Sequence, residues 1–151
     1  MPYLLDTNHC IYLMNGWNTE EEHRTPEEKQ TIASLQGLDD DDIVCMSEAS
    51  IGELLYGIER SQRKASNRMR FHVLVSAIPP VPVVREVWDI YGETKAELSL
   101  CGKRIPDMDL LIASTAQYYD LVLVAHDKHM RYIPDRFRQE NWAKGVVERE
   151  E

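Results

Sequence analysis

Four acidic residues stand where predicted strands end or where the following helices begin. Asp6 directly follows the apolar run PYLL, and Asp127 lies two residues after the run LVLVA. Glu53 lies in the first turns of the helix predicted after the run IVCM, and Asp109 lies near the start of a helix that opens at Pro106. Because ligands bind at the carboxyl ends of the strands in an open parallel sheet, these four acids can share one edge.

A cluster of carboxylates is unfavourable by itself, because the charges repel and each group must lose its water. All the ligands would be oxygen atoms, which favours a hard cation, Mg²⁺ with Mn²⁺ as a plausible substitute, over zinc. Such an ion keeps open positions, so it can bind phosphate oxygens and help to generate hydroxide for in-line attack. The residues therefore predict metal-dependent phosphoester hydrolysis, with Asp107 as a further possible ligand.

Each acid also has a purely structural explanation. Glu53 occupies the last position of an S-x-x-E pattern and could complete a capping box. Asp107 and Asp109 could be first-turn acids that interact with a helix dipole, and Asp6 and Asp127 could each begin a turn or cap a helix. Asp109 is the hardest to explain in this way, because it leads into the apolar run LLIA, where an unpaired buried acid is costly.

Short apolar runs predict the strands that would position these acids. The runs are PYLL at 2–5, IVCM at 43–46, VPVV at 81–84 and LVLVA at 121–125. Three of them lack clean alternation, which is typical of parallel strands that are covered on both faces. Apolar stripes between the runs predict helices around 51–58, over 62–78, over 84–100 with a stop at Gly102, and after Pro106. Alternating strands and helices predict an α/β sandwich.

The composition is that of an ordinary globular domain. The chain has 151 residues, of which 43% are hydrophobic and 28% charged, enough for one domain with a buried core. The apolar runs are too short to span a membrane, and the start MPYLLDTN lacks the basic region of a secretory signal. The three widely spaced cysteines fit neither a disulfide framework nor a metal knuckle, so we expect reduced thiols and a cytoplasmic protein.

The net charge of −9 argues, taken as a whole, against binding to nucleic acid. The charge is unevenly distributed, however. The acidic excess is concentrated in residues 19–42, whereas residues 60–72 contain five basic and no acidic residues, and residues 128–144 contain five basic and two acidic ones. Such blocks are usually solvated faces, but these two basic segments are also available for phosphate groups.

Several blocks of the chain together resemble one family. The strings YLLDTN, S-x-x-S-I-G-E-L-L-Y-G-I-E-R-S, GKRIPDMDLLIASTA, LVLVAHDKHMRYIP and ENW resemble the PIN-domain family, and most of all its VapC-type ribonuclease toxins from type II toxin–antitoxin pairs. The resemblance runs from Tyr3 to Trp142. It implies a three-layer α/β/α sandwich with a central parallel sheet, a Mg²⁺-dependent endoribonuclease activity, inhibition by a cognate antitoxin and a homodimer. It also implies one domain at 1–145, with a longer than usual acidic segment at 15–42, and a short acidic tail at 146–151.

The resemblance assigns roles to the same acids by position. Asp6, Glu53, Asp109 and Asp127 match the family's catalytic and metal-binding acids, and Asp107 stands where an acid is frequent but less regular.

The basic segment that follows the Glu53 helix could hold the RNA backbone beside the acids through Arg60, Arg63 and Lys64. Two alternatives remain open from the sequence. One is a non-catalytic module of this fold that binds nucleic acid or protein. The other is a metal-dependent phosphohydrolase of small phosphoesters, which the carboxylate chemistry alone would also permit.

Overall fold

The computed structural model describes residues 1–144, so the predicted acidic tail at 146–151 lies outside the described residues. Five strands form one all-parallel sheet in the order β3-β2-β1-β4-β5. The strands are β1 (Pro2–Leu5), β2 (Ile43–Ser47), β3 (Pro80–Val81), β4 (Val122–Val124) and β5 (Gln139–Glu140). The α-helices are α1 (Thr7–Gly16), α2 (Pro26–Gln36), α3 (Glu48–Arg60), α4 (Lys64–Ala77), α5 (Arg85–Leu100) and α6 (Asp107–Tyr118), and two 3₁₀ helices are η1 (Glu21–His23) and η2 (Lys128–Tyr132).

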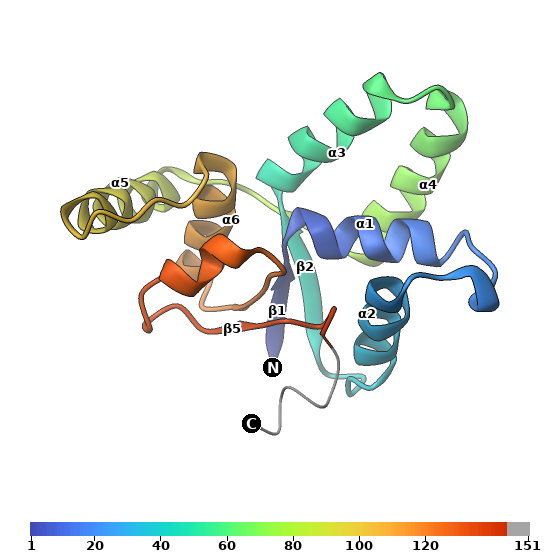
Figure 1. Cartoon of the computed structure of the whole chain (residues 1–151), viewed down its shortest axis with the longest axis horizontal. Coiled ribbons are helices and arrows are strands. Elements are labelled where there is room, and N and C mark those ends of the chain that lie inside the picture. The colour runs from blue at the N-terminus through green and yellow to red at the C-terminus, as the bar shows by residue number, and fades with distance from the viewer. Residues whose placement is uncertain (145–151) are drawn as a thin grey trace.

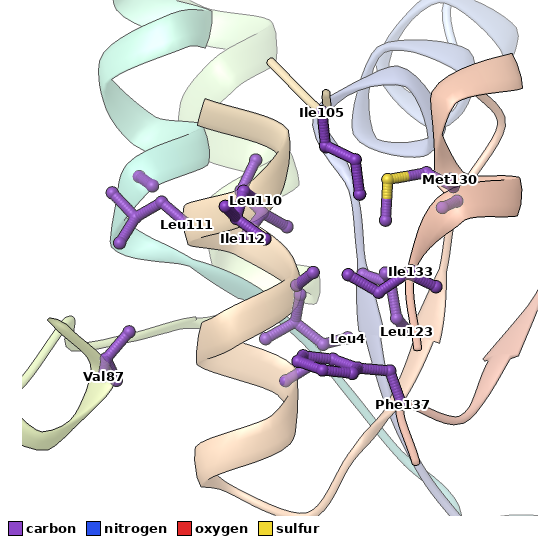
Figure 2. Packing of buried hydrophobic residues seen from close by; sticks show 14 of the residues in the cluster. Leu4, Val87, Ile105, Leu110, Leu111, Ile112, Leu123, Met130, Ile133 and Phe137 are labelled. Carbon is purple, nitrogen blue, oxygen red and sulfur yellow. The ribbon is translucent and has the colours of Figure 1, made fainter. Parts of the chain in front are cut away.

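Helices cover both faces of the sheet, which confirms the predicted α/β/α sandwich (Figure 1). Alternate strand residues point to opposite faces, so that Leu4 and Leu123 pack with α5, α6 and η2, while Leu5 and Val124 pack with α1, α3 and α4. Figure 2 shows the first of these two cores, with the buried face of α6 against Leu4 and Leu123. Burial on both faces explains why these strands read as apolar runs without alternation.

The strand predicted at 81–84 is wrong in its extent. Only Pro80 and Val81 pair with β2, and the chain leaves the sheet at Pro82. A proline has no N–H to donate to a ladder, so two prolines two positions apart restrict this segment to a short edge strand. The strand β5 was not predicted either, because Gln139 and Glu140 belong to no apolar run. They pair with β4 at the other edge of the sheet.

The acidic segment at 15–42 contains the helix α2, which was not predicted. Thr25 caps this helix by accepting a hydrogen bond from the Glu28 amide, and the Glu28 carboxylate accepts one from the Thr25 amide. Pro26 occupies the first helical position. The capping box and the proline were both readable in the string TPEE, so the acidic composition hid a clear helix start.

The predicted stop at Gly102 is confirmed, and it fixes the loop before α6. Gly102 has a φ of +67°, its amide donates to Ser99 O at 3.0 Å, and the Lys103 amide donates to Leu98 O at 2.9 Å. These two bonds are those of a Schellman motif. The motif turns the chain sharply after α5, so that Lys103 and Arg104 lead directly to the start of α6 at the carboxyl edge of the sheet. No helix within residues 1–144 combines the length and the hydropathy needed to cross a membrane.

Candidate active site

Three of the predicted acids surround one small cavity at the carboxyl edge of the sheet. Asp6 follows β1, Asp109 lies in the first turn of α6, and Asp127 follows β4. Their side chains line a cavity of about 10 Å³, whose remaining walls are Ile112, Leu123, Ala125 and Met130. A volume of this size holds about one water molecule or a small ion. The fold therefore brings Asp6 together with Asp109 and Asp127, more than 100 positions later in the sequence, around one cavity whose other walls are apolar.

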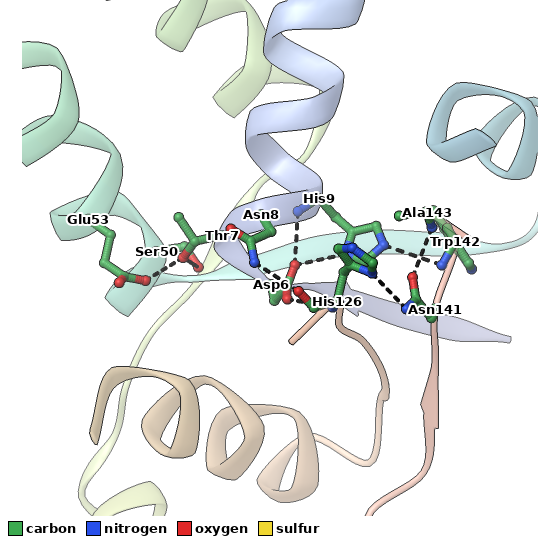
Figure 3. A network of polar contacts seen from close by, with 10 residues as sticks. All are labelled: Asp6, Thr7, Asn8, His9, Ser50, Glu53, His126, Asn141, Trp142 and Ala143. Carbon is green, nitrogen blue, oxygen red and sulfur yellow. Dashed lines mark hydrogen bonds and ion pairs between the residues drawn. The ribbon is translucent and has the colours of Figure 1, made fainter. Parts of the chain in front are cut away.

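Asp6 is held rigidly by donors on both of its oxygens (Figure 3). Its Oδ1 accepts the His9 amide at 2.9 Å and lies 2.8 Å from His9 Nδ1, while Oδ2 accepts the His126 amide at 3.0 Å. The bond from the His9 amide is also the N-cap of α1. The structural and the functional explanations of Asp6 are thus compatible, because the cap orients the carboxylate at the cavity.

His9 is a buried partner of this acid that the sequence analysis missed. Its ring is fully buried, and its Nε2 accepts the Trp142 amide at 3.3 Å. With Nε2 accepting, Nδ1 carries the proton and donates to Asp6. The one signal in the sequence was the spacing of three residues in DTNH, which places His9 one helical turn after the cap. His9 therefore links Asp6 to the segment that follows β5.

Glu53 is tied to the start of α1 and lies beside the cavity. Thr7 Oγ1 donates a short hydrogen bond to Glu53 Oε1 and lies 3.1 Å from Ser50 Oγ (Figure 3). The predicted capping box of Ser50 and Glu53 is wrong, because α3 begins earlier. Its N-cap is Ser47, whose hydroxyl accepts the Ala49 amide, so Glu53 lies in the second turn of α3 and its carboxylate is free to face Thr7.

Asp109 carries the electrostatic signature of the cluster. Its pKa is raised to about 6, most of all by burial and further by the negative charges of Asp127, Glu53 and Asp6. These causes indicate that the four acids lie close enough to repel one another electrostatically. Binding of a proton or a cation would relieve this repulsion. We refer to Asp6, Glu53, Asp109 and Asp127 together as the acid cluster.

Asp127 begins η2 and pairs with a histidine. Its Oδ1 accepts the His129 amide at 2.7 Å and lies 2.7 Å from His129 Nδ1. As with Asp6, the same carboxylate both caps a helical segment and lines the cavity.

Asp107 does not join the acid cluster. Its Oδ1 lies 2.8 Å from Lys95 Nζ and accepts the Tyr91 hydroxyl at 3.0 Å, both on α5. These hydrogen bonds lower the pKa of Asp107, and the Asp107 charge is not among those that raise the pKa of Asp109. Two residues along a helix correspond to a rotation of about 200°, so neighbouring acids in the string DMD face different sides.

The donor set fits a hard cation that keeps part of its water. Within residues 1–144, three ligand atoms within 4.8 Å of one another occur only at the exposed group Glu20, Glu22 and His23. No three ligand atoms of the acid cluster lie this close to one another within these residues, so an ion at the cavity would keep room for water beside its carboxylate ligands. Magnesium ions are commonly held in this way, by one or two carboxylates and several water molecules.

The comparisons with known proteins agree with this geometry. The PIN domain family matches residues 3–135. The chain belongs to the PIN-domain family. It is 30% identical over 145 residues to the protein named Ribonuclease VapC2 from Rickettsia felis, covering 95% of this chain and 100% of the relative. This PIN domain also resembles a chain in the solved complex VapBC2 from Rickettsia felis bound to a promoter DNA fragment, with a TM-score of 0.80 and 28% identity over 94% of this chain and 99% of that chain. It further resembles a chain in VapBC-1 from nontypeable Haemophilus influenzae, with a TM-score of 0.78 and 27% identity over 94% of this chain and 98% of that chain.

The basic residues predicted to bind RNA lie at the far end of the α3–α4 hairpin of this PIN domain. Arg60 ends α3 with its guanidinium 5.3 Å from the centroid of the Tyr56 ring, and Arg63 and Lys64 stand where α4 begins. Figure 1 shows this end of the hairpin pointing away from the sheet. Glu53 and Arg60 share one face of α3, separated by two turns or about 10 Å. These cations flank the acid cluster at a distance and do not line its cavity.

Proposed function

We propose that this PIN domain is a Mg²⁺-dependent endoribonuclease that hydrolyses phosphodiester bonds in RNA. The observation that carries the proposal is the convergence of Asp6, Asp109 and Asp127 on one small cavity, with Glu53 beside it. The relatives named ribonucleases support the choice of RNA as substrate. Mn²⁺ is expected to substitute, because the same oxygen ligands suit it.

Asp6 and Asp109 are the residues that we propose as direct ligands. Asp6 is held in place by its three donors, and Asp109 is the acid whose charge is most unfavourable without a cation. Glu53 and Asp127 would complete the site directly or through water, oriented by Thr7 and by His129 respectively. A bound Mg²⁺ would polarise the phosphate and lower the pKa of the attacking water.

The biological role that we propose is the toxin of a toxin–antitoxin pair. The VapBC complexes among the similar structures support a cognate antitoxin as partner, and a homodimer is proposed from the family resemblance. We propose a cytoplasmic location, since all three cysteines are free thiols and two of them are buried.

The test is cleavage of structured RNA with and without Mg²⁺ by the wild type and by the Asp6→Asn variant. We expect cleavage only with Mg²⁺ and only by the wild type, because the amide keeps the shape of Asp6 but removes the charge. Equal cleavage by the two proteins contradicts the assigned site.

A chromogenic phosphomonoester in the same buffers tests the alternative of a small-molecule phosphohydrolase. Calorimetric titration with Mg²⁺ tests the alternative of a non-catalytic module, which would bind no ion at the cavity.

A further inference from the structure

A basic groove adjoins the acid cluster at His129. It has a volume of about 480 Å³ and lies between the loop that follows α5 and the helix η2. Its lining residues are Gly102, Lys103, Arg104, Pro106, His129 and Tyr132. We call this the η2 groove. The excess of basic charge at 128–144 is evident in the sequence, but only the fold brings residues 102–104 opposite this segment.

The η2 groove adjoins the acid cluster through two elements. His129 lines the groove and is also the residue whose amide and ring nitrogen contact Asp127 Oδ1, both at 2.7 Å. On the other wall, Pro106 is the N-cap of α6 and precedes Asp109 by three residues. A nucleic acid chain with one phosphate at the acid cluster would therefore meet this groove with the adjacent part of its backbone.

The cations of the η2 groove form no close ion pair within residues 1–144, although the charge of Arg104 contributes to the lowered pKa of Asp107. Lys103 and Arg104 are exposed, and neither has an ion-pair partner within residues 1–144. By contrast, Arg136 is paired with Glu97 and Arg138 with Asp120. Unpaired cations in a chain with a net charge of −9 increase the attraction of this one surface for phosphate.

An aromatic ring that lines the groove lies between two basic residues. Tyr132 is partly exposed, with Lys103 Nζ 5.6 Å and Arg131 Cζ 4.6 Å from its ring centroid. Surfaces that bind single-stranded nucleic acid combine such rings, which stack on bases, with cations that follow the backbone. The Schellman motif at Gly102 holds the loop in place, so the groove is formed before a ligand binds.

We propose that the η2 groove binds the single-stranded RNA that adjoins the cleaved phosphate, with Lys103 and Arg104 on backbone phosphates and Tyr132 against a base. This inference rests on the proposed function and specifies where its substrate lies. It adds RNA contacts at Lys103, Arg104 and Tyr132 to those predicted for the basic residues at the far end of the α3–α4 hairpin.

The binding test uses a short fluorescein-labelled oligouridylate, with EDTA present so that nothing is cleaved. The double variant Lys103→Gln/Arg104→Gln is expected to bind about tenfold more weakly than the wild type, with a salt dependence smaller by about 1.4 in the slope of log K against log[salt]. The matched control is Lys29→Gln/Arg85→Gln, which removes the same charge from α2 and from the start of α5. We expect the control to bind within about twofold of the wild type, as a charge lost away from the site should.

Cleavage separates a failure of this inference from a failure of the proposed function. If the wild type cleaves no RNA with Mg²⁺, the proposed function fails, while the binding data still report on the groove. If the wild type cleaves RNA and the groove variant matches the control in both KM and affinity, the groove inference alone is overturned. We expect KM to rise in the groove variant and not in the control.

The Tyr132→Leu variant distinguishes RNA from polyanions in general. Loss of one stacking surface should weaken oligouridylate binding at least about fivefold. Displacement of the labelled RNA by inorganic polyphosphate, which has no bases, reports on the charges alone, and its inhibition constant should not change. Unaltered oligouridylate binding, or an equal loss with both probes, would contradict the assignment of Tyr132 to a base.

Discussion

The acid cluster and the η2 groove adjoin each other at His129, yet they are built in opposite ways. The carboxylates of Asp6 and Asp127 are fixed by backbone amides, and the pKa of Asp109 is raised by burial and by its acidic neighbours. The cations of the groove, Lys103 and Arg104, are exposed and carry no ion-pair partner within residues 1–144. Ion binding at the acid cluster depends on the fixed positions of the carboxylates, whereas phosphate binding at the groove depends on the charge of exposed side chains.

This difference predicts two kinds of functional loss. A change in the acid cluster should reduce turnover and ion binding, because a water molecule that replaces a lost carboxylate brings no negative charge to the ion. A change in the groove should reduce affinity for RNA in a manner that depends on salt. The variants below test whether the two regions separate as this contrast requires.

The largest effect is expected for Asp109→Asn. Removing this charge from the acid cluster should lower Mg²⁺-dependent RNA cleavage at least about 100-fold, since even residues that only support metal ligands contribute 10- to 100-fold. Oligouridylate binding in EDTA should remain at wild-type strength or increase, because the groove is intact and a negative charge is lost. If the variant cleaves RNA normally, Asp109 is not part of the active site. If the variant no longer binds RNA, the acid cluster and the η2 groove do not act separately.

His9 should show the effect of a positioning residue. His9→Ala removes the ring donor to Asp6, so we expect Mn²⁺ affinity, measured by electron paramagnetic resonance, to fall about 10- to 100-fold. In His9→Asn the side-chain amide can reproduce the Nδ1 donor, and part of the affinity should return. If both variants lose thermal stability equally while Mn²⁺ affinity is unchanged, His9 serves only the packing around Trp142.

A smaller effect concerns stability and pH in the metal-free protein. Because the pKa of Asp109 is raised to about 6, the folded chain holds this proton more tightly than the unfolded chain does. Its contribution to stability is therefore present below about pH 4 and is lost as the pH rises from about 4 to 6. Asp109→Asn should then stabilise the protein at pH 7.5, by about 1 kcal/mol after allowance for solvent screening of a half-buried group.

Thermal unfolding in EDTA at the two pH values measures this contribution. A gain of about 1 kcal/mol corresponds to an increase of about 2–4 °C in Tm for a chain of this size. The gain should vanish near pH 4, and Mg²⁺ should raise the Tm of the wild type more than that of the variant. A variant that is less stable than the wild type at pH 7.5 would show that the negative charge of Asp109 does not destabilise the folded protein.

The smallest effect is expected for Asp107→Asn. Asp107 pairs with Lys95 and Tyr91 on the exposed side of α6, so its loss should change RNA cleavage by less than about twofold. This variant is the matched control for Asp109→Asn, since both change an aspartate in the same helical turn. A loss comparable to that of Asp109→Asn would extend the acid cluster to a fifth residue.

Much of the fold and part of the site could be read from local patterns. The apolar runs at 2–5 and 43–46 and the stop at Gly102 are correct to within a residue. The strand at 81–84 was overestimated because its prolines were not weighed. The helix α2 was missed because the acidic composition of its segment outweighed the capping signal in TPEE.

The sequence by itself determined which acids follow which elements, and hence that Asp6, Glu53, Asp109 and Asp127 could meet at one edge of a parallel sheet. The order of the elements along the chain and the carboxyl-edge rule suffice for that expectation. Only the tertiary structure decided that Asp107 turns towards Lys95, that His9 joins Asp6 to Trp142, and that residues 102–104 face η2. The reason is physical: side-chain direction within a helical turn, and contacts between segments far apart in the chain, depend on packing that no local pattern encodes.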